Sequence, residues 1–408
     1  MIPALLPLDC PDYESQFARI LENGTLPCFD PSVIDFLDAF SRSVLLDESR
    51  RPLPEMAAVA HWMRKAHTVQ LHKTFEEMRK DRLWVPRGIA LHFAPANVDS
   101  IFLYSWFVSM LAGNANIVRL SQTRNEPVTL LLAKLNILLQ QEQFKAIRDR
   151  SLILSYAHDD NVTQKLSEAC HLRVLWGGDD SVRRLRAVPM NPLGSEIVFP
   201  NRFSLAALSA HELTLLNPEQ LRKLAARFCN DAYWFDQMAC SSPRLLVWVG
   251  NHADCQAAQN LFWMEVEKEL VKRGLQYPEV VGMNKLVSAY VAAGMGFADK
   301  LHSDINGPIS RVRLAEQASA EFRRIECGGG LFFEREIEEL DDLASLLSEK
   351  DQTISYFGLQ PKDLRRLVHS LPMRAIDRIV PIGTALDFSA VWDGNNLLQS
   401  FSREIDFK

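Results

Sequence analysis

The chain of 408 residues is long enough for two domains, each with its own hydrophobic core. Hydrophobic residues make up 47% of the sequence and charged residues 24%, which is ordinary for a globular protein. The net charge of −6 argues against a dedicated nucleic-acid-binding protein, which needs a basic face to neutralise phosphates. Seven cysteines without a C-x-x-C pair predict reduced thiols, a cytoplasmic location and no metal site.

The first 80 residues are predicted to be helical. Residues 31–40 place apolar side chains at helical spacing, and we expect residues 1–80 to form a helical segment that packs on a cofactor domain. The longest apolar run, residues 101–113, is shorter than the roughly 20 residues that span a membrane. It therefore predicts a buried core helix, and we expect no membrane span.

From residue 82 onward, short apolar strands alternate with helices. Such alternation predicts an α/β fold with a parallel, doubly wound sheet, which we assign to a dinucleotide-binding domain over residues 81–210. The sequence has no G-x-G-x-x-G fingerprint, so periodicity alone does not establish nucleotide binding. Strands are expected at 88–93, 115–120, 151–156 and 172–176, and helices at 99–112, 125–146, 160–169 and 179–187.

The second half of the chain begins with a clear helix start. Asn217 is expected to cap a helix, followed by Pro218 in the first turn and Gln220 three residues after the cap. A strand at 244–249 and a helix at 254–273 predict a second α/β domain. We place this catalytic domain at 211–375 and a C-terminal arm at 376–408, with a soft boundary between the domains near 205–215.

Cys240 lies between the helix that starts at Asn217 and the apolar strand at 244–249. A thiol just before a buried strand, flanked by small polar residues, is a candidate nucleophile. The alternative is that Cys240, like most cysteines, is an inert core residue.

Several segments in chain order resemble the aldehyde dehydrogenase superfamily. Within it, the chain is most similar to the acyl-CoA and acyl-protein thioester reductases related to the long-chain fatty acyl reductase of bacterial bioluminescence. The resemblance runs from about residue 85 to the C-terminus. It is carried by Pro95, Asn97, Ala112-Gly113-Asn114, Arg119, Trp176-Gly177-Gly178, the spacing of Gln237 and Cys240, Asp377 to Gly383, and Trp392-Asp393-Gly394.

This resemblance implies an aldehyde dehydrogenase-like fold and an aldehyde-forming oxidoreductase. The expected reaction is reduction of an acyl thioester by NADPH through an S-acyl-Cys240 intermediate. The Asn97 side chain and the Cys240 backbone N–H would stabilise the oxyanion, although Asn97 could instead only cap the following helix. A partner acyl-activating protein could supply the acyl group, and superfamily members commonly form homo-oligomers.

The resemblance also places the cofactor. Trp176, Gly177 and Gly178 match the pyrophosphate loop, although Asp179 and Asp180 put carboxylates at the same helix N-terminus. Arg119, Ser121 and Gln122 match the segment that holds the adenosine ribose. Gln122 stands where many NAD-preferring members carry glutamate, and the nearby Arg124 could pair with a 2′-phosphate, which together predict NADPH. The alternative for Arg119 and Arg124 is solvation at the surface.

Phe199 falls roughly where hydrolytic aldehyde dehydrogenases carry a general-base glutamate, so the expected product is an aldehyde rather than an acid. Two other functions stay open: an acyl-phosphate reductase of the same superfamily and a non-catalytic acyl-handling scaffold in a multienzyme complex. We expect His92 and His158 to be structural, with proton transfer as the alternative. The glycine run after Cys327 is expected to be a plain loop, with the lining of a substrate channel as the alternative. Glu334 and Glu336 are candidates for the nicotinamide ribose.

Overall fold

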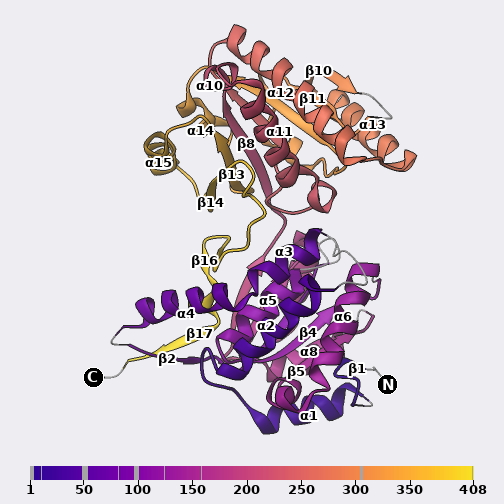
Figure 1. Cartoon of the computed structure of the whole chain (residues 1–408), viewed down its shortest axis with the longest axis vertical. Helices are drawn as coiled ribbons and strands as arrows, with labels where there is room; N and C mark the ends of the chain where they lie inside the picture. Colours follow the sequence, from indigo (N-terminus) through magenta and orange to yellow (C-terminus); the bar gives the residue numbers. More distant parts are fainter. Residues whose placement is uncertain are drawn as a thin grey trace. The chain divides into compact units, whose positions relative to one another are not determined.

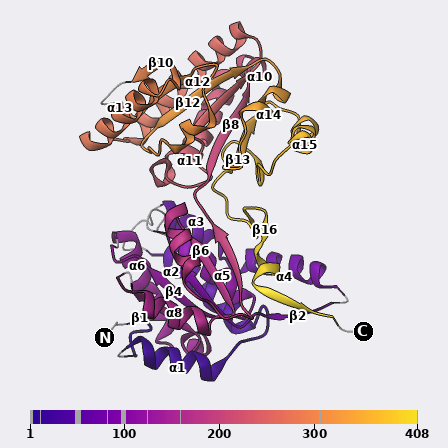
Figure 2. The same ribbon diagram turned by 180° about the vertical axis from the view of Figure 1, so that it is seen from behind.

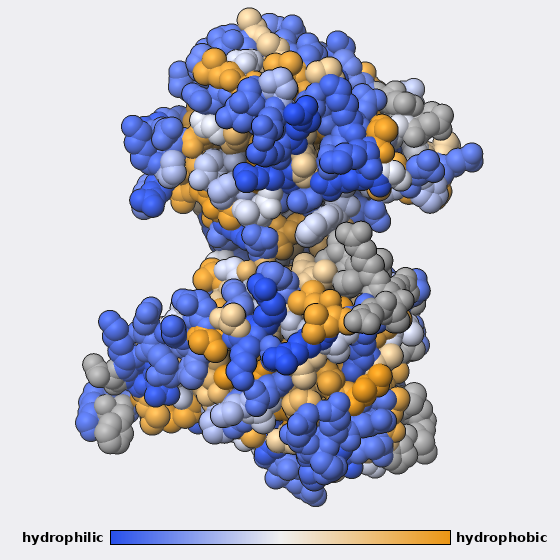
Figure 3. Space-filling model, in the orientation of Figure 1, coloured by the Kyte–Doolittle hydropathy of each residue, from blue (hydrophilic) through white to orange (hydrophobic). Residues whose placement is uncertain are grey.

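The computed structural model describes residues 4–10, 12–47, 54–80, 82–95, 101–123, 125–157, 159–303, 307–406 and 408. The chain forms two compact units (Figure 1). Unit 1 comprises Met1–Asn201 together with Phe388–Lys408, and unit 2 comprises Arg202–Asp387. On the face in Figure 3 both units show mainly hydrophilic side chains with apolar ones scattered among them. None of the helices described is long and apolar enough to cross a bilayer.

The N-terminal part of unit 1 is largely helical, as the sequence predicts. Asp12 and Asp30 cap the first two helices by accepting hydrogen bonds from the backbone N–H groups of Ser15 and Ser32. A short strand, β1 (Ala4–Leu6), precedes them and pairs antiparallel with β5 of the central sheet. The helices are α1 (Tyr13–Asn23), α2 (Pro31–Leu45), α3 (Pro54–Trp62) and α4 (Lys65–Arg79).

The central sheet of unit 1 has six strands in the order β1-β5-β4-β3-β6-β7. All neighbours pair in parallel except β1 and β5, which confirms the predicted doubly wound sheet. The strands are β3 (Ile89–Phe93), β4 (Ala115–Leu120), β5 (Ser151–Ser155), β6 (Leu172–Trp176) and β7 (Ser195–Phe199). The helices between them are α5 (Ile101–Leu111), α6 (Glu126–Leu139), α7 (Lys145–Arg148), α8 (Asp160–Ala169) and α9 (Asp179–Ala187), with a 3₁₀ turn, η1, at Glu142–Phe144.

Helix α5 is the buried core helix that its apolar run predicts. Every residue from Ile101 to Leu111 is buried. Aromatic side chains of α2 pack on it, with the ring centroids of Phe40 and Phe107 5.1 Å apart. A helix that is apolar on all sides is covered on all sides, here by the sheet and by α2.

Unit 2 is built on a seven-stranded sheet in the order β10-β11-β12-β9-β8-β13-β14. Only the pair β10–β11 is antiparallel. The strands are β8 (Phe203–Ser209), β9 (Leu245–Val249), β10 (Ala298–Ser303), β11 (Ser310–Leu314), β12 (Leu331–Ile337), β13 (Asp351–Phe357) and β14 (Arg378–Pro381). The helices are α10 (Ala210–Thr214), α11 (Pro218–Tyr233), α12 (His252–Arg273), α13 (Glu279–Gly294), α14 (Leu343–Leu346) and α15 (Pro361–Ser370), with 3₁₀ turns η2 (Trp234–Gln237), η3 (Ala320–Arg324) and η4 (Leu340–Asp342).

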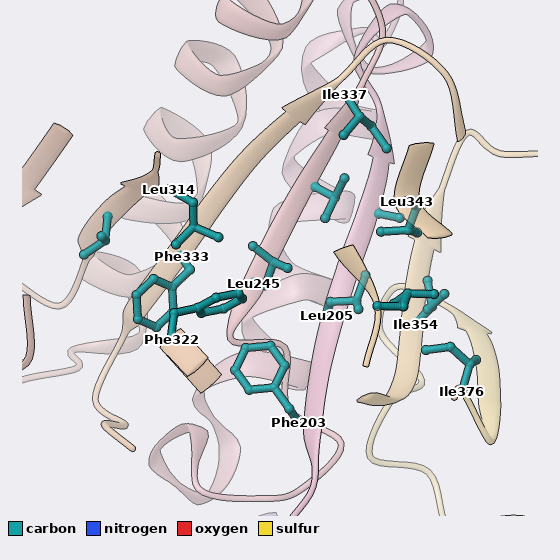
Figure 4. Packing of buried hydrophobic residues seen from close by; sticks show 14 of the residues in the cluster. Phe203, Leu205, Leu245, Leu314, Phe322, Phe333, Ile337, Leu343, Ile354 and Ile376 are labelled. Carbon is teal, nitrogen blue, oxygen red and sulfur yellow. The ribbon is translucent and has the colours of Figure 1, made fainter. Parts of the chain in front are cut away.

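One row of side chains shows how the sheet of unit 2 builds its core. Phe333, Leu245, Leu205 and Ile354 stand opposite one another on four adjacent parallel strands. All four are at most 2% exposed and lie in one hydrophobic cluster (Figure 4). These strands are covered on both faces, which explains why they read as continuous apolar runs in the sequence.

The two units separate at Asn201 and Arg202, whereas the sequence placed the boundary at residue 210. The difference arises because β8 pairs with β9 and β13, and so belongs to the second sheet. The expected arm is also divided: β14 pairs with β13, and only Phe388–Lys408 joins unit 1. There the last strand, β17 (Ser402–Ile405), pairs antiparallel with β2 (Leu83–Pro86), and the two lie side by side in Figures 1 and 2. The remaining elements are β15 (Val391–Trp392), β16 (Asn395–Asn396) and α16 (Leu397–Ser400).

Candidate active site

The strand order of unit 1 defines a switch point between β3 and β6. From β3 the chain moves outward through β4 to β5, and then crosses back to β6 on the other side of β3. The helices that follow β3 and β6 therefore start on opposite faces of the sheet, and ligands of such sheets bind at the carboxyl ends of these strands. Gly177 and Gly178 follow Trp176, the last residue of β6, and the segment containing Asn97 follows β3. Asn97 itself lies outside the described residues.

The glycine loop after β6 leaves room for a ligand above its backbone. A Cβ added at Gly178 would meet no atom within 4 Å, and one at Gly177 only the Ser181 Cβ at 3.6 Å. Gly178 caps α9 without a side-chain hydrogen bond. The Trp176 indole is buried, donates to Ser105 Oγ at 3.2 Å and stacks on Phe199 at 3.8 Å between ring centroids. The Trp176 side chain is therefore used in packing beside the loop. The groups that a ligand could reach are those of the Gly177 and Gly178 backbone.

The carboxylates at the start of α9 have protein partners. Asp180 forms an ion pair with Arg183, and Asp179 accepts a hydrogen bond from the Asn201 backbone N–H at 3.3 Å. The Arg183 guanidinium therefore offsets part of the negative charge that the sequence places at this helix N-terminus.

The predicted adenosine segment follows the next strand outward. Arg119, near the end of β4, donates to the Tyr156 carbonyl at 3.1 Å, and its guanidinium lies 5.5 Å from the centre of the Tyr156 ring. Burial lowers the pKa of Arg119, and the nearby Tyr156 acts in the opposite direction. The Ser121 carbonyl accepts from Ser155 Oγ, while Gln122 is exposed. Arg124 lies outside the described residues.

His92 is a structural residue, as expected. It is 1% exposed, and its ring nitrogens lie 2.8 Å from Ser105 Oγ and 3.0 Å from Asn116 Oδ1. Burial lowers the pKa of His92 to about 4, so the ring is neutral near pH 7. His158 lies outside the described residues.

In unit 2, Cys240 lies in a turn with unusual backbone geometry. Phe235, Asp236 and Gln237 have φ values of 56°, 51° and 66°, which is the left-handed region. This conformation costs about 1–2 kcal/mol for each non-glycine residue. Three such residues in succession persist only where the surrounding structure over-determines them, and strain of this kind is typical of functional sites. Cys240 follows three residues later and is half-buried.

Burial distinguishes Cys240 from most of the other cysteines. Desolvation raises the pKa of Cys170, Cys229 and Cys255 to about 12 and that of Cys28 to about 11. These four thiols stay protonated near pH 7, and the protonated form is a poor nucleophile. Cys240 is half-buried and follows the left-handed turn, so it is a stronger candidate nucleophile than these four thiols.

Two residues beside Cys240 were not identified from the sequence. Ser204 Oγ, at the start of β8, donates to the Cys240 carbonyl at 2.6 Å. The Arg244 guanidinium lies 4.6 Å from the centre of the Phe203 ring. Burial lowers the pKa of Arg244, and Glu326 and Cys240 act in the opposite direction, so Cys240 lies within electrostatic range of a cation. The sequence signal for Arg244 was only its closeness to Cys240, and Ser204 gave no signal.

The two candidates for the nicotinamide ribose have protein partners. Glu334 is 4% exposed and accepts hydrogen bonds from the indole N–H groups of Trp248 and Trp263. Burial raises the pKa of Glu334, and Arg311 and the two indoles act in the opposite direction. Glu336 contacts His252 and Gln259. Among the described residues no group of three or more His, Cys, Asp or Glu side chains could hold a metal ion.

Solved structures with a similar architecture include aldehyde dehydrogenases. The substrate-bound AldH of Staphylococcus aureus matches with a TM-score of 0.63 and 13% identity over 97% of this chain and 93% of that one. PnpE in complex with nicotinamide adenine dinucleotide matches with a TM-score of 0.65 and 10% identity over 96% and 88%. At these identities the likeness establishes the fold, and it confirms the expected aldehyde dehydrogenase-like architecture.

The sequence matches the acyl-CoA reductase (LuxC) family over residues 70–404, so the chain belongs to this family. Curated relatives include the long-chain acyl-protein thioester reductases of Aliivibrio fischeri, 24% identical over 45% of this chain, and Photobacterium phosphoreum, 21% identical over 47%. These matches cover 36% and 38% of the relatives' lengths. The family match confirms the resemblance found in the sequence.

Proposed function

We propose that this chain reduces an acyl thioester to an aldehyde with NADPH through an S-acyl intermediate on Cys240. The observation that carries the proposal is the position of Cys240: a half-buried thiol after three left-handed residues, in a member of the acyl-CoA reductase family. The names of the curated relatives, long-chain acyl-protein thioester reductases, support this class of substrate.

In the first step the Cys240 thiolate attacks the thioester carbonyl. The new carbon–sulfur bond replaces the old one, and the donor thiolate leaves, so no oxidation or reduction occurs. By the family resemblance, the Asn97 side chain would donate to the oxyanion, and each such donor is worth about 3–4 kcal/mol. NADPH, when bound, supplies the hydride that reduces the acyl carbon. Collapse of the resulting thiohemiacetal releases the aldehyde and restores the Cys240 thiolate.

The cofactor is proposed to bind at the switch point of unit 1. The open backbone at Gly177 and Gly178 would receive the pyrophosphate at the start of α9. Arg119, Ser121 and Gln122 would hold the adenosine ribose after β4. Gln122 has no charge to repel a 2′-phosphate and Arg124 could pair with one, which favours NADPH over NADH.

Phe199 supports release of an aldehyde rather than an acid. Its ring is 3% exposed and stacks on Trp176 at the end of β6. A phenyl ring cannot activate water, so a general base is missing at the position where the superfamily pattern places one. The acyl group would then stay on Cys240 until the hydride arrives. Its donor could be a CoA thioester or an acyl-transferring protein partner.

The proposed function predicts stoichiometric aldehyde formation from acyl-CoA and NADPH. We expect NADPH to be preferred over NADH in kcat/KM by at least about tenfold, equivalent to about 1.4 kcal/mol. The measurement follows NADPH oxidation and aldehyde release for acyl-CoAs of several chain lengths, with an acyl phosphate in parallel. Aldehyde from the acyl phosphate alone would overturn the thioester assignment, and no reaction with any donor would favour the scaffold alternative.

A further inference from the structure

The turn that carries Cys240 is fixed by residues far away in the sequence. We propose that Gln237, Gly328–Gly330 and Ser204, which we call the turn clamp, position Cys240 for acyl transfer, with Gln237 as the principal positioning residue. The inference rests on the proposed function, because it concerns the same nucleophile. It assigns roles to a glutamine and a glycine loop that the sequence alone did not provide.

The Gln237 side chain forms the centre of the turn clamp. It is 1% exposed, whereas the neighbouring Asp236 and Met238 are exposed, so the turn directs only the glutamine inward. Its Nε2 donates to the carbonyls of Pro243 and Leu331 at 3.1 and 3.0 Å, and its Oε1 accepts from the Gly330 N–H at 3.0 Å. Both amide hydrogens and the carbonyl oxygen are therefore used. No apolar side chain of this size could make these three bonds.

These bonds close the chain around Cys240. Gln237 lies three residues before Cys240 and Pro243 three residues after it, so their hydrogen bond ties the two ends of the nucleophile segment together. The bond to Leu331 attaches the segment to the first residue of β12. The segment that carries Cys240 is therefore attached to strand β12 as well as to its own neighbours in the chain.

The glycine loop contacts the turn through Gly328 and Gly329, and it leaves no room for a side chain at Gly328 or Gly330. The Gly329 N–H donates to the Asp236 carbonyl at 2.9 Å. A Cβ at Gly328 would lie 2.3 Å from the Asp236 carbonyl oxygen and 2.8 Å from Met238 Sδ. A Cβ at Gly330, where φ is 85°, would lie 1.9 Å from the Pro308 carbonyl oxygen. Gly328 and Gly330 are thus required for close backbone approach, and the expectation of a plain loop is incomplete.

Ser204 holds the turn from the other side. Its Oγ donates to the Cys240 carbonyl at 2.6 Å, and the Ser204 carbonyl accepts from the Arg244 N–H at 2.9 Å. Ser204 is fully buried on β8. The Cys240 carbonyl is therefore attached to β8, and the residue just before β9 is attached to the same serine.

When the backbone of a nucleophile is fixed in this way, its thiol approaches the substrate carbonyl in one orientation. Displacement of a reacting atom by about 1 Å can reduce a rate by about 100-fold. Loss of the clamp should therefore slow acyl transfer strongly while leaving substrate binding nearly unchanged. A role limited to stability would lower the melting temperature without this selective loss.

The test replaces Gln237 by methionine, which has a similar length and cannot form the three hydrogen bonds. The matched control is Gln16→Met, because Gln16 is fully buried in unit 1 and its Nε2 donates to the carbonyls of Arg148 and Ser151. Both variants lose two side-chain hydrogen bonds to backbone carbonyls. We expect Q237M to lower kcat about 10- to 100-fold with KM changed less than threefold, and Q16M to change neither by more than twofold.

A second readout separates this proposal from the proposed function. Alkylation of Cys240 by iodoacetamide, measured by peptide mass spectrometry relative to Cys28, needs neither acyl substrate nor NADPH. We expect Q237M to change the relative rate at least fivefold and Q16M to leave it unchanged. If no thioester acylates the wild type, the proposed function fails, and the alkylation rates alone decide the positioning role. Equal kinetics and equal alkylation in Q237M and Q16M would overturn the proposal.

Ser204→Ala provides a second test of the proposal if Q237M does not fold. This change removes only a hydroxyl, together with its bond to the Cys240 carbonyl. It is expected to lower kcat about 3- to 10-fold, consistent with loss of one hydrogen bond, and to alter the relative alkylation of Cys240. Wild-type values for both quantities would overturn the clamp.

Discussion

Replacing Cys240 by alanine is expected to abolish NADPH-dependent reduction of acyl-CoA. The proposed pathway has a covalent step at the Cys240 thiol, and removal of a nucleophile of this kind costs at least about 10⁴-fold in kcat. Cys240 is the half-buried thiol on the strained turn, whereas burial raises the pKa of Cys170, Cys229 and Cys255 to about 12. None of these three should substitute for it.

The control for this experiment is Cys28→Ala. Cys28 is also half-buried, but it lies in unit 1 and burial raises the pKa of its thiol to about 11. C28A should reduce acyl-CoA at the wild-type rate. A C240A variant that keeps more than about one hundredth of the wild-type rate, far above the expected loss, would contradict the role given to Cys240.

The second large effect concerns stability. The Arg323 guanidinium donates to both carboxylate oxygens of Asp351 at 2.9 and 2.8 Å, and the two side chains are 5% and 0% exposed. Arg323→Met leaves a buried carboxylate without its counter-charge. This is expected to lower the free energy of unfolding of unit 2 by about 3–5 kcal/mol. Urea unfolding followed by fluorescence measures the difference.

The adjacent residue provides a matched control. Arg324 pairs with Glu321 at 2.8 Å, but these side chains are 81% and 50% exposed. Arg324→Met should cost less than about 1 kcal/mol, because an exposed ion pair is screened by solvent. If R323M and R324M unfold at the same urea concentration, the Arg323–Asp351 pair does not stabilise the fold as argued.

The alternating strands and helices could be predicted because the sequence patterns that define them are local. Strands at 115–120 and 172–176 and helices at 160–169 and 179–187 begin and end as expected. The capping box of Asn217 and Gln220 forms as the sequence indicates. The unit boundary was not predictable in this way, because β8 is assigned to unit 2 by its pairing with β13, about 150 residues later in the chain.

The candidate site, like the fold, could be predicted from the sequence only where its signals are local. Cys240 could be selected from its place before an apolar strand, but the turn clamp depends on the contact between Gln237 and Gly330, 93 residues apart. The three consecutive glycines predict an unusual backbone conformation, but the sequence does not show which part of the chain packs against them. Glu334 is a further case, since the sequence offers this carboxylate as a ribose candidate but does not show that two indole N–H groups bind it in the core.

The most direct test of the account is intact-protein mass spectrometry after mixing the protein with acyl-CoAs of several lengths. We predict that the wild type gains the mass of one acyl group, that Cys240→Ala gains none, and that NADPH discharges the adduct as aldehyde. An adduct that also forms on C240A, or one that NADPH does not discharge, would contradict an acyl-enzyme mechanism at Cys240.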